Sequence, residues 1–499
     1  MAETYVDKAS EEAVSERMKL TGGEIIGRAL RSYGVPYAAG IPGHGAWAML
    51  DGLMQPGAEI PFVQVFHEQA AIHLADGYYR ASGRPMAAFT SVGPGAANTT
   101  MGLATAFADS TSLIYFGGAP PTHMIGHGTM QELDRHHAND FSQITRVVTK
   151  RQFSVDRTEQ LPATIHRAFN AMLTGRPGPV HIEVPMDVQA LAAEVEIHDL
   201  DRRLPIGVIH PDPEAIERAE RVLAAAERPV MVVGGGAVTG EAAGAIRSLA
   251  EALSVPVVTT WNGKGVFPED HRLFAGAVGQ TGTIPGNAIA ASADVVISVG
   301  CKFTDWSASS YRRGVSFSIP PARLIHIDVD PYEIGKTYPA EVGIVADAGA
   351  AVAALRDAVG DSPKLPAGRE GFLAELDRLK DEWLEKEAKR LNSDNFPFTS
   401  QRPLRDLRRV LPRDGILVVG SGNPQGAVKQ SFPVYEPRTH LGSGTYSSMG
   451  WAVPAAIGAK LAQPDRQVAC VLGDGDFLMT LEEIAVCVTN DIPVVFVVQ

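Results

Sequence analysis

The chain is poor in cysteine: it has three among 499 residues, Cys301, Cys470 and Cys487, and no two of them form a CxxC pair. This scarcity excludes a disulfide framework and gives no support for a zinc site. The sequence also lacks an apolar run of membrane-spanning length, and residues 1–18 are too polar and acidic for a secretory signal. We therefore expect a soluble, cytoplasmic protein with no membrane partner.

Positive charge is also scarce. The chain has 44 Lys and Arg residues against 57 Asp and Glu, a net charge of −13, which argues against nucleic acid or an anionic membrane as the main partner. Small anionic ligands must then be bound by groups within a local site, because the net charge of the protein does not attract them. With 45% hydrophobic residues the composition is that of an ordinary globular protein, and the length suits about three domains.

Residues 20–186 alternate between helix and strand patterns. The predicted helices are one through residue 30 capped by Thr21, then 46–54, 66–81 and 99–108, and the predicted strands are 35–39, 61–65, 87–90 and 113–117. This alternation predicts a doubly wound α/β domain with a parallel sheet.

The rest of the chain predicts further domains of the same class. Residues 191–205 are predicted to be a linker, and the strands of the next α/β domain are expected at 229–233, 256–260, 294–300 and 324–329. Residues 371–391 form a charged amphipathic helix that connects domains. We thus predict three doubly wound parallel-sheet domains, at 18–190, 206–360 and 401–499, with a helical linker at 366–400.

A short acidic turn is the first candidate site. Residues 467–472 predict a strand, Gly473-Asp474-Gly475 a turn, 477–488 a helix and 493–498 a second strand. In an open α/β sheet this turn lies where ligands bind, and a lone carboxylate there suits a magnesium ion that bridges to phosphate. The sequence therefore predicts that Asp474 binds Mg²⁺ beside a diphosphate, and an ordinary tight turn is the alternative.

Glu68 is the second candidate. It stands where a strand ends and a helix begins, with Val63 and Val65 before it and Ala70 and Ala71 after it. Partial burial among these apolar residues would raise the pKa of Glu68 and make it a proton donor to a ring nitrogen. A solvated carboxylate favoured by the helix dipole is the alternative.

With these two positions, the sequence resembles the thiamine-diphosphate enzymes along nearly its whole length, most closely the acetohydroxyacid (acetolactate) synthase, pyruvate oxidase and benzaldehyde lyase group. Three segments carry the resemblance in order, HEQAAIHLADGYYRASGRP, TSVGPGAANTTMGLATAFADS and TGRPGPVHIEVPMD. In that family a GDG turn and a later Asn pair hold magnesium and diphosphate. By the family's spacing this Asn falls just beyond Gln499, so we expect the third domain to be incomplete, without its last strand and lid.

The resemblance implies a set of cofactor-binding residues. They are Gly43, Glu68, Pro94, Asn98, Asn423, Gln425, Ser448, Met449, Gly473, Asp474, Gly475 and Asp476. Glu68 is expected to hold the aminopyrimidine ring of thiamine, Met449 to prop the cofactor in a bent shape, and Asp474 to bind the metal. Asn423 can replace the Gln of the synthases, whereas Pro424 cannot donate a hydrogen bond.

The residues expected near the substrate depart more from the synthases. Besides Glu68, the catalytic candidates are His44, Gln131 and Lys150. Lys150 can hold the carboxylate of a 2-oxo acid or lie in solvent. His44 resembles a turn of the trihydroxycyclohexanedione hydrolases, where it can bind a substrate oxygen or cap the turn. The nearby histidines have a spacing that does not favour a metal: His123, His127, His136 and His137.

The resembling synthases and oxidases carry FAD in the central domain. The residues that would bind FAD in this chain are Gly234, Gly235, Gly300, Lys302, Asp328 and Asp347. However, the synthases have other residues where Lys302 and Thr304 stand, and the GGG run lacks the full GxGxxG spacing. Bound FAD and a purely structural domain both remain open.

The resemblance implies a carboligase that depends on thiamine diphosphate and Mg²⁺, is similar to acetolactate synthase, and acts on small 2-oxo acids or aldehydes. We expect a homodimer or homotetramer in which Glu68 of one subunit meets Asp474 of another. The alternatives are a carbon–carbon lyase or hydrolase, which His44 suggests, an FAD-dependent 2-oxo acid oxidase, and a binding protein without activity. The sequence leaves the acyl donor and acceptor open.

Overall fold

The computed structural model describes residues 17–133, 140–197 and 207–499. Its first domain contains β1 (Met18–Thr21), α1 (Gly22–Ser32), β2 (Ala38–Gly40), α2 (Trp47–Met54), β3 (Phe62–Gln64), α3 (Glu68–Ser82), β4 (Ala87–Thr90), α4 (Pro94–Asn98), α5 (Thr100–Ala108), β5 (Ile114–Ala119), η1 (Thr122–Met124), α6 (Asp140–Arg146), β6 (Arg151–Ser154), η2 (Thr158–Gln160), α7 (Leu161–Leu173), β7 (Val180–Pro185), α8 (Met186–Ala190) and β8 (Ala192–Val195).

The central domain contains α9 (Pro213–Ala224), β9 (Pro229–Val233), α10 (Gly235–Thr239), α11 (Ala243–Leu253), β10 (Val257–Thr259), η4 (Trp261–Gly263), β11 (Phe274–Ala277), α12 (Ile284–Ala291), β12 (Val295–Val299), β13 (Arg323–Asp328), β14 (Val342–Val345) and α13 (Ala348–Val359). After α14 (Gly368–Leu391), the third domain contains α15 (Gln401–Val410), β15 (Ile416–Val419), α16 (Asn423–Ser431), β16 (His440–Gly442), α17 (Ala452–Ala462), β17 (Val468–Leu472), α18 (Asp474–Leu478), η5 (Leu481–Glu483), α19 (Ile484–Thr489) and β18 (Val495–Val498).

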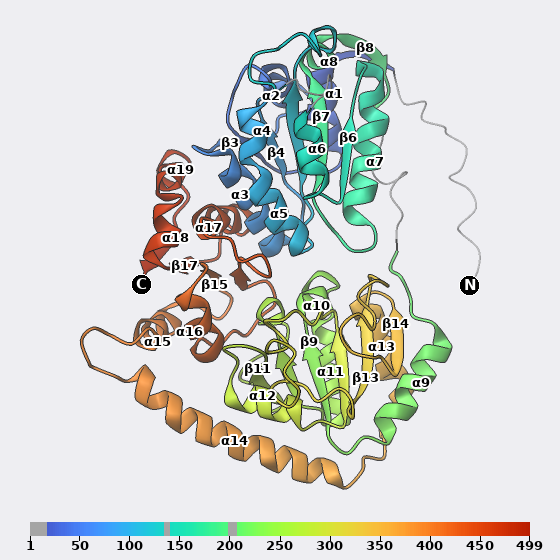
Figure 1. Ribbon diagram of the computed structural model, residues 1–499, viewed down its shortest axis with the longest axis vertical. Helices are drawn as coiled ribbons and strands as arrows, with labels where there is room; N and C mark the ends of the chain where they lie inside the picture. Colours follow the sequence, from blue (N-terminus) through green and yellow to red (C-terminus); the bar gives the residue numbers. More distant parts are fainter. Residues whose placement is uncertain (1–16, 134–139, 198–206) are drawn as a thin grey trace.

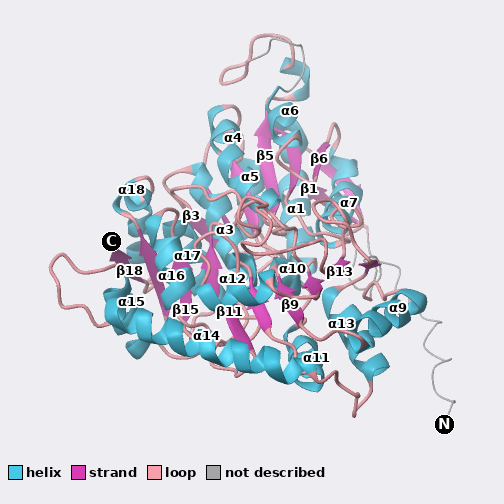
Figure 2. Cartoon of the chain, turned by 60° about the horizontal axis from the view of Figure 1, so that its bottom comes forward, coloured by secondary structure: helices cyan, strands magenta, loops and turns pink. Residues whose placement is uncertain are grey.

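Three parallel sheets organise the described part of the chain, one in each domain, and β1 and β8 form a further two-stranded sheet (Figure 1). The strand orders of the three parallel sheets are β3-β2-β4-β5-β7-β6, β11-β10-β9-β12-β13-β14 and β16-β15-β17-β18, and the neighbours in each are parallel. Figure 2 shows the strands enclosed between helices, as parallel sheets require because both of their faces must be covered. The predicted α/β class is confirmed, and all three domains are present.

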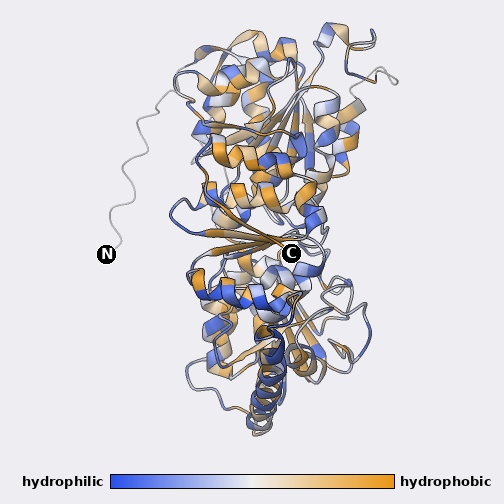
Figure 3. Cartoon of the chain, turned by 90° about the vertical axis from the view of Figure 1, so that its left-hand side faces the viewer, coloured by the Kyte–Doolittle hydropathy of each residue, from blue (hydrophilic) through white to orange (hydrophobic). Residues whose placement is uncertain are grey.

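The helix that joins the central and third domains is polar over most of its surface. In Figure 1, α14 runs along the bottom edge of the molecule, and Figure 3 shows it largely blue, while the strands are mostly orange. Phe372 and Leu376 alone form its buried apolar stripe, against the central domain. Within the described residues no helix has the combination of length and apolarity that a membrane crossing demands.

Several local predictions need correction. The region 191–205 was expected to be a linker, but Ala192–Val195 forms β8, which pairs antiparallel with β1. The predicted helix 477–488 is instead three short elements, α18, η5 and α19. Helix 99–108 is preceded by a separate turn of helix, α4, and β11 and β14 were not predicted.

The first and third domains are joined by two helices in close contact. A Cβ on Gly77 of α3 would lie 2.1 Å from the Ala455 carbonyl oxygen, and a Cβ on Gly458 of α17 would lie 2.0 Å from the Leu74 carbonyl oxygen. Only glycine allows backbones to approach this closely. Side chains of both helices share one apolar core, so the two domains form a single packed unit.

A buried charge network crosses the same contact. Arg80 of α3 donates to Asp76 through Nε at 2.7 Å and to Asp109 through Nη2 at 3.1 Å, and its Nη1 donates to the Gly442 carbonyl oxygen at 2.6 Å. Trp451 of the third domain donates from Nε1 to Asp76 at 2.7 Å. Burial raises the pKa of Asp76, but the Arg80 charge and these hydrogen bonds outweigh it, so the pKa lies below its ordinary value.

Asp109 extends this network to all three domains. Its Oδ1 accepts from the Asn262 amide of the central domain at 3.0 Å and from the Thr445 N–H of the third domain at 3.0 Å. Asp109 itself follows α5 of the first domain. One carboxylate therefore holds the point where the three domains meet.

We predict that Asp76→Ala destabilises the protein by about 3–5 kcal/mol, because it leaves the buried Arg80 guanidinium without its partner. The pKa of Asp76 is lowered in the folded state, so its stabilisation is present at neutral pH and is lost as the pH falls toward that lowered pKa. Urea unfolding of wild type and Asp76→Ala at several pH values measures both effects. Asp51→Ala, at an exposed site, is the control and should unfold like wild type; an equal loss in both variants would contradict the role of the network.

Candidate active site

The first candidate region surrounds Glu68, which is half-buried at the start of α3, beyond the carboxyl end of β3. Asn98 Nδ2 donates to Glu68 Oε2 at 2.9 Å. A Cβ on Gly95 would lie 3.3 Å from Glu68 Oε1, so the 91–98 loop passes directly beside the carboxylate. Of the predicted cofactor residues, the structure therefore brings together Glu68 and Asn98, with Pro94 in the same loop.

The predicted substrate residues His44 and Gln131 belong to this region. Gly45 donates its N–H to Ser91 Oγ at 3.2 Å, and a Cβ on Gly43 would meet the Ser91 side chain, so the turn that carries His44 rests on the 91–98 loop. Gln131 has a φ of +67°, and its carbonyl oxygen is 1.6 Å from the position of a Cβ on Gly93. We call Gly43, His44, Glu68, the 91–98 loop and Gln131 the acid half-site.

Lys150 does not join the acid half-site. It precedes β6, at the amino edge of the sheet, whereas Glu68 lies beyond a carboxyl edge. Its Nζ donates to the Thr174 carbonyl oxygen at 2.6 Å. Burial, together with the charges of Arg151 and Arg176, lowers the pKa of Lys150 to about 8. Within one chain Lys150 thus lies at the opposite edge of the sheet from Glu68, where it interacts with Asp330 of the central domain. Of the four clustered histidines, His136 and His137 lie outside the described residues.

The second candidate region is the turn after β17. Asp474 is exposed, and a Cβ on Gly473 would have no atom within 4 Å, so a ligand can reach this backbone freely. A Cβ on Gly475 would lie 3.0 Å from Met449 Cε, which places the Met449 side chain against the turn. We call the 473–476 turn and the 448–449 segment the diphosphate-turn half-site.

The second aspartate of the turn has a different environment. Asp476 is buried, and its two carboxylate oxygens accept N–H groups from Ser421 at 2.7 Å and Gly450 at 2.6 Å. Burial raises the pKa of Asp476, and these N–H groups partly oppose the rise. Asp476 therefore binds the backbone of the loops at Ser421 and Gly450 to its own turn, while the Asp474 carboxylate is exposed at the surface.

Several serine hydroxyl groups lie next to this turn and form hydrogen bonds with one another and with Gln425. Ser421 Oγ lies 2.8 Å from Ser443 Oγ, and Gln425 Nε2 donates to Ser443 Oγ at 3.2 Å and to Ser447 Oγ at 3.3 Å. Ser448 Oγ lies 2.9 Å from Thr105 Oγ1 of the first domain. The predicted residues Gln425 and Ser448 thus belong to one polar network next to Met449.

Each half-site is bordered by exposed apolar side chains. Phe66 and Trp47 are exposed near the acid half-site, and Leu478, Met479 and Leu481 are exposed after the 473–476 turn. Exposed apolar groups that form one contiguous patch are typical of surfaces that bind another molecule.

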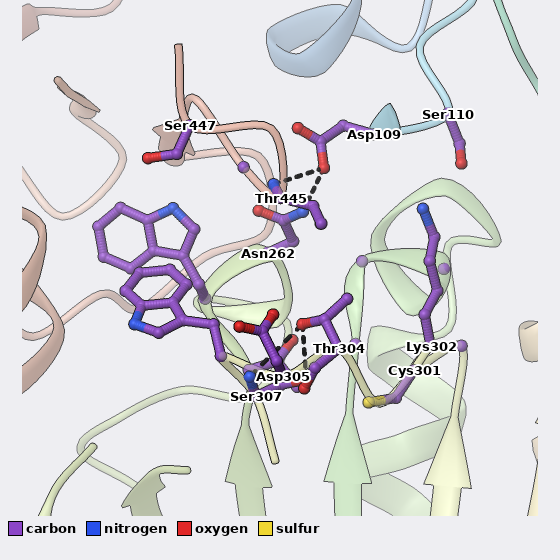
Figure 4. Close-up of a pocket in the computed structure, with 18 of the residues that line it drawn as sticks. Asp109, Ser110, Asn262, Cys301, Lys302, Thr304, Asp305, Ser307, Thr445 and Ser447 are labelled. Atoms are coloured by element: carbon purple, nitrogen blue, oxygen red, sulfur yellow. Dashed lines mark hydrogen bonds between the residues drawn. The ribbon is translucent and has the colours of Figure 1, made fainter. Parts of the chain in front are cut away.

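A cavity of about 480 Å³ lies where the three domains meet (Figure 4). Its walls include Asp109, Ser110 and Arg176 from the first domain and Asn423, Gln425 and Ser447 from the third. Five of the predicted FAD residues line it, Gly234, Gly235, Gly300, Lys302 and Asp328, whereas Asp347 does not and instead accepts the Ile209 N–H. Neither Glu68 nor Asp474 is in the wall.

Basic groups face this cavity from different domains. Arg176 pairs with Glu333 at 3.2 Å and donates to Ser110 Oγ at 2.9 Å. Lys302 Nζ donates to the Ala108 carbonyl oxygen at 2.6 Å, and burial lowers its pKa to about 8. Lys429 Nζ donates to the Gln280 carbonyl oxygen at 2.7 Å, and burial lowers its pKa to about 7. The cavity wall therefore carries basic groups from all three domains, and it also contains Asp109, Asp305, Asp328 and Glu333.

Sequence reasoning missed Asp109, Lys429 and Glu483. Asp109 stands in a segment that carried the family resemblance, but nothing in its pattern indicates a three-domain contact. Glu483 stands beside Glu482 in the sequence, a pattern typical of solvated residues, yet its side chain is fully buried.

The described residues contain no group of three or more His, Cys, Asp or Glu side chains that could hold a metal ion. A metal at Asp474 would thus need further ligands of another kind, such as backbone or amide carbonyl oxygens, water, or the oxygens of a bound molecule.

Three family models match this chain. They are the thiamine pyrophosphate enzyme N-terminal TPP binding domain over residues 20–138, the central domain over 216–355 and the C-terminal TPP binding domain over 420–499. The chain is 37% identical to a probable acetolactate synthase large subunit of Methanocaldococcus jannaschii, over 95% of this chain and 79% of that protein. It is 32% identical to the acetolactate synthase isozyme 3 large subunit of Escherichia coli K12, over 96% and 82%. With the acetolactate synthase large subunit of Corynebacterium glutamicum the identity is 34%, over 97% and 75%.

We predict that substitution of the two aspartates of the turn has unequal effects on stability. Asp476→Ala leaves the N–H groups of Ser421 and Gly450 unsatisfied and should lower the free energy of unfolding by about 2–4 kcal/mol. Asp474→Ala, at an exposed position, should change it by less than about 0.5 kcal/mol. Urea unfolding without ligands measures both variants, and equal losses would contradict the assignment.

Proposed function

The chain belongs to the thiamine pyrophosphate enzyme family, and from this premise we propose that it is a thiamine-diphosphate-dependent carboligase of the acetolactate synthase type. It decarboxylates a small 2-oxo acid of the pyruvate class and joins the remaining acyl group to a second carbonyl compound. The observation that carries this proposal is the pair of half-sites, one with Glu68 held by Asn98 and one with an outward-facing Asp474, on a chain similar to acetolactate synthase large subunits over nearly its full length.

The diphosphate-turn half-site fits a metal-bound diphosphate. The open backbone at Gly473 admits phosphate oxygens, and the exposed Asp474 carboxylate can share Mg²⁺ with them. The neighbouring Ser421, Ser443 and Ser447 hydroxyls can donate to the same oxygens. Met449, against Gly475, provides an apolar support for the rings.

The acid half-site fits the pyrimidine end of the cofactor. Thiamine diphosphate, when bound, would supply a carbon nucleophile for the 2-oxo acid and a thiazolium ring that takes up the electron pair left when carbon dioxide departs. Because Asn98 engages Oε2 of Glu68, Oε1 is the oxygen that shares a proton with a pyrimidine nitrogen. His44 and Gln131 lie on two loops that both rest against the 91–98 segment, and we propose that they bind substrate oxygens. Phe66 and Trp47, the exposed apolar side chains near the acid half-site, would exclude water once a second subunit covers them.

We infer that the active site forms between two copies of the chain. Each half-site is bordered by exposed apolar side chains, which a second subunit would cover. In a homodimer, or a homotetramer built from such dimers, Glu68 of one subunit faces Asp474 of the other. The three cysteines are free, which suits the reducing cytoplasm.

We also propose that the three-domain cavity binds FAD. Its size, the close backbone approach of Gly234 to Gly300, and the basic groups around it suit an anionic dinucleotide. Lys302 takes the place of the synthase residue at this position and already donates to Ala108, so its contact with the flavin nucleotide differs from that of the synthases.

Mixing two inactive variants tests the shared site. Glu68→Gln and Asp474→Ala chains should each lose more than about 100-fold in acetolactate formation from pyruvate, since each removes one half-site of every active site. Co-expressed, they should regain about a quarter of wild-type activity, because mixed dimers contain one intact site. Mass spectrometry of the intact assembly verifies that mixed dimers form, and mixed dimers without activity would contradict the shared site.

The reaction type is tested with the purified enzyme, thiamine diphosphate and Mg²⁺. Pyruvate should yield carbon dioxide and acetolactate in the absence of oxygen. Release of carbon dioxide without acetolactate, or cleavage of a diketone without decarboxylation, would favour the lyase or hydrolase alternative that His44 suggests.

The flavin proposal predicts a yellow protein with the absorption of bound FAD. Gly235→Leu should abolish that absorption, because a Cβ on Gly235 already lies 3.1 Å from Asn262 and a larger side chain extends into the cavity. Gly371→Ala, in open space on α14, is the control. A colourless wild-type protein that binds no added FAD would contradict the proposal.

A further inference from the structure

A third-domain glutamate reaches the segment that carries Glu68. Glu483, in η5, has a fully buried side chain. Its Oε1 accepts the N–H of Phe66 at 3.0 Å and the N–H of His67 at 2.9 Å, and its Oε2 lies 3.3 Å from the Phe66 nitrogen. Phe66 and His67 immediately precede Glu68. A residue of one domain therefore holds the backbone of another domain at the position next to the candidate acid.

The contact has a clear physical basis. The first N–H groups at the start of a helix lack partners within the helix and carry partial positive charge, so a carboxylate placed there is favoured. Here Glu483 takes the N–H groups just before α3, and His67 Nδ1 accepts the Gln69 N–H at 3.2 Å. Burial raises the pKa of Glu483 to about 7, and the two backbone N–H groups oppose this rise. A buried carboxylate costs free energy, and the hydrogen bonds to Phe66 and His67 offset that cost.

Two contacts thus determine where the Glu68 carboxylate lies. Asn98 of the first domain engages its side chain, and Glu483 of the third domain fixes the backbone before it. Glu483 also follows the Asp474 turn closely in the chain, through α18. The acid half-site and the diphosphate-turn half-site of one chain are therefore joined through this carboxylate.

We propose that Glu483 is a positioning residue for the reaction, which sets the place of the Glu68 carboxylate by capping the segment that leads into α3. This proposal rests on the proposed function, in which Glu68 shares a proton with the cofactor. Glu483 does not touch the reacting groups. It acts through Phe66 and His67, so its loss should affect turnover more than cofactor or substrate binding.

Four variants of the full-length enzyme test the proposal. Glu483→Ala removes both hydrogen bonds, Glu483→Asp withdraws the carboxylate by one methylene, and Glu483→Gln keeps an oxygen that can accept the same N–H groups. Glu482→Ala, at the exposed neighbouring position, is the matched control. The measurements are kcat and KM for pyruvate, the affinity for thiamine diphosphate with Mg²⁺ by calorimetry, and hydrogen exchange of the peptide that contains Phe66 and His67.

We expect kcat to fall about 10-fold to 100-fold in Glu483→Ala and Glu483→Asp, as misplacement of a catalytic group by about 1 Å does. KM and cofactor affinity should change less than about 3-fold, because the Asp474 turn is intact. Glu483→Gln should recover most of the turnover, and Glu482→Ala should match wild type. Exchange at Phe66 and His67 should be faster in Glu483→Ala than in Glu483→Gln.

Turnover like wild type in both Glu483→Ala and Glu483→Asp would overturn the proposal. So would a parallel loss of turnover and cofactor affinity that Glu483→Gln does not relieve, since that pattern indicates a general structural role. If Glu483→Ala does not fold, the contrast between Glu483→Asp and Glu483→Gln decides. If the wild type itself releases no carbon dioxide from pyruvate, the proposed function fails, and the exchange of Phe66 and His67 alone decides whether Glu483 holds this segment.

Discussion

The buried network of Asp76, Arg80 and Asp109 is the interaction on which the arrangement of the three domains depends. Arg80 donates to both carboxylates and to the Gly442 carbonyl oxygen, and Asp109 accepts from the central and third domains at once. A buried guanidinium without these partners would be very costly, so the network tolerates one relative placement of the domains. The cavity at the domain junction exists because that placement is held.

Contacts between the first and third domains also join the two half-sites of one chain. Tight packing of α3 against α17 fastens the first domain to the third, and Glu483 caps the segment before Glu68 from the third domain. The Asp474 carboxylate nevertheless faces outward, with exposed apolar side chains next to it. We propose that this thiamine-diphosphate-dependent carboligase gains a complete site when a second copy of the chain covers these surfaces.

Much of the fold could be predicted because parallel strands are continuous apolar runs. β4 and β9 begin and end at the predicted residues, and Thr21 caps α1 through the expected side-chain contact. β11 was missed because its sequence, FAGA, is short and rich in small residues, and β8 because its existence depends on pairing with distant β1. At the site, the glycine turn and Glu68 carry local signals, whereas the inward turn of Glu483 and the three-domain role of Asp109 depend on tertiary contacts that no local pattern encodes.

The most direct test of the shared active site is a crystal structure with thiamine diphosphate and Mg²⁺ bound. The account predicts that the Glu68 carboxylate of one subunit contacts the pyrimidine ring of a cofactor whose diphosphate and metal are held by Asp474 of the other subunit. A cofactor held by Glu68 and Asp474 of the same chain, or a pyrimidine ring that lies away from Glu68, would contradict it.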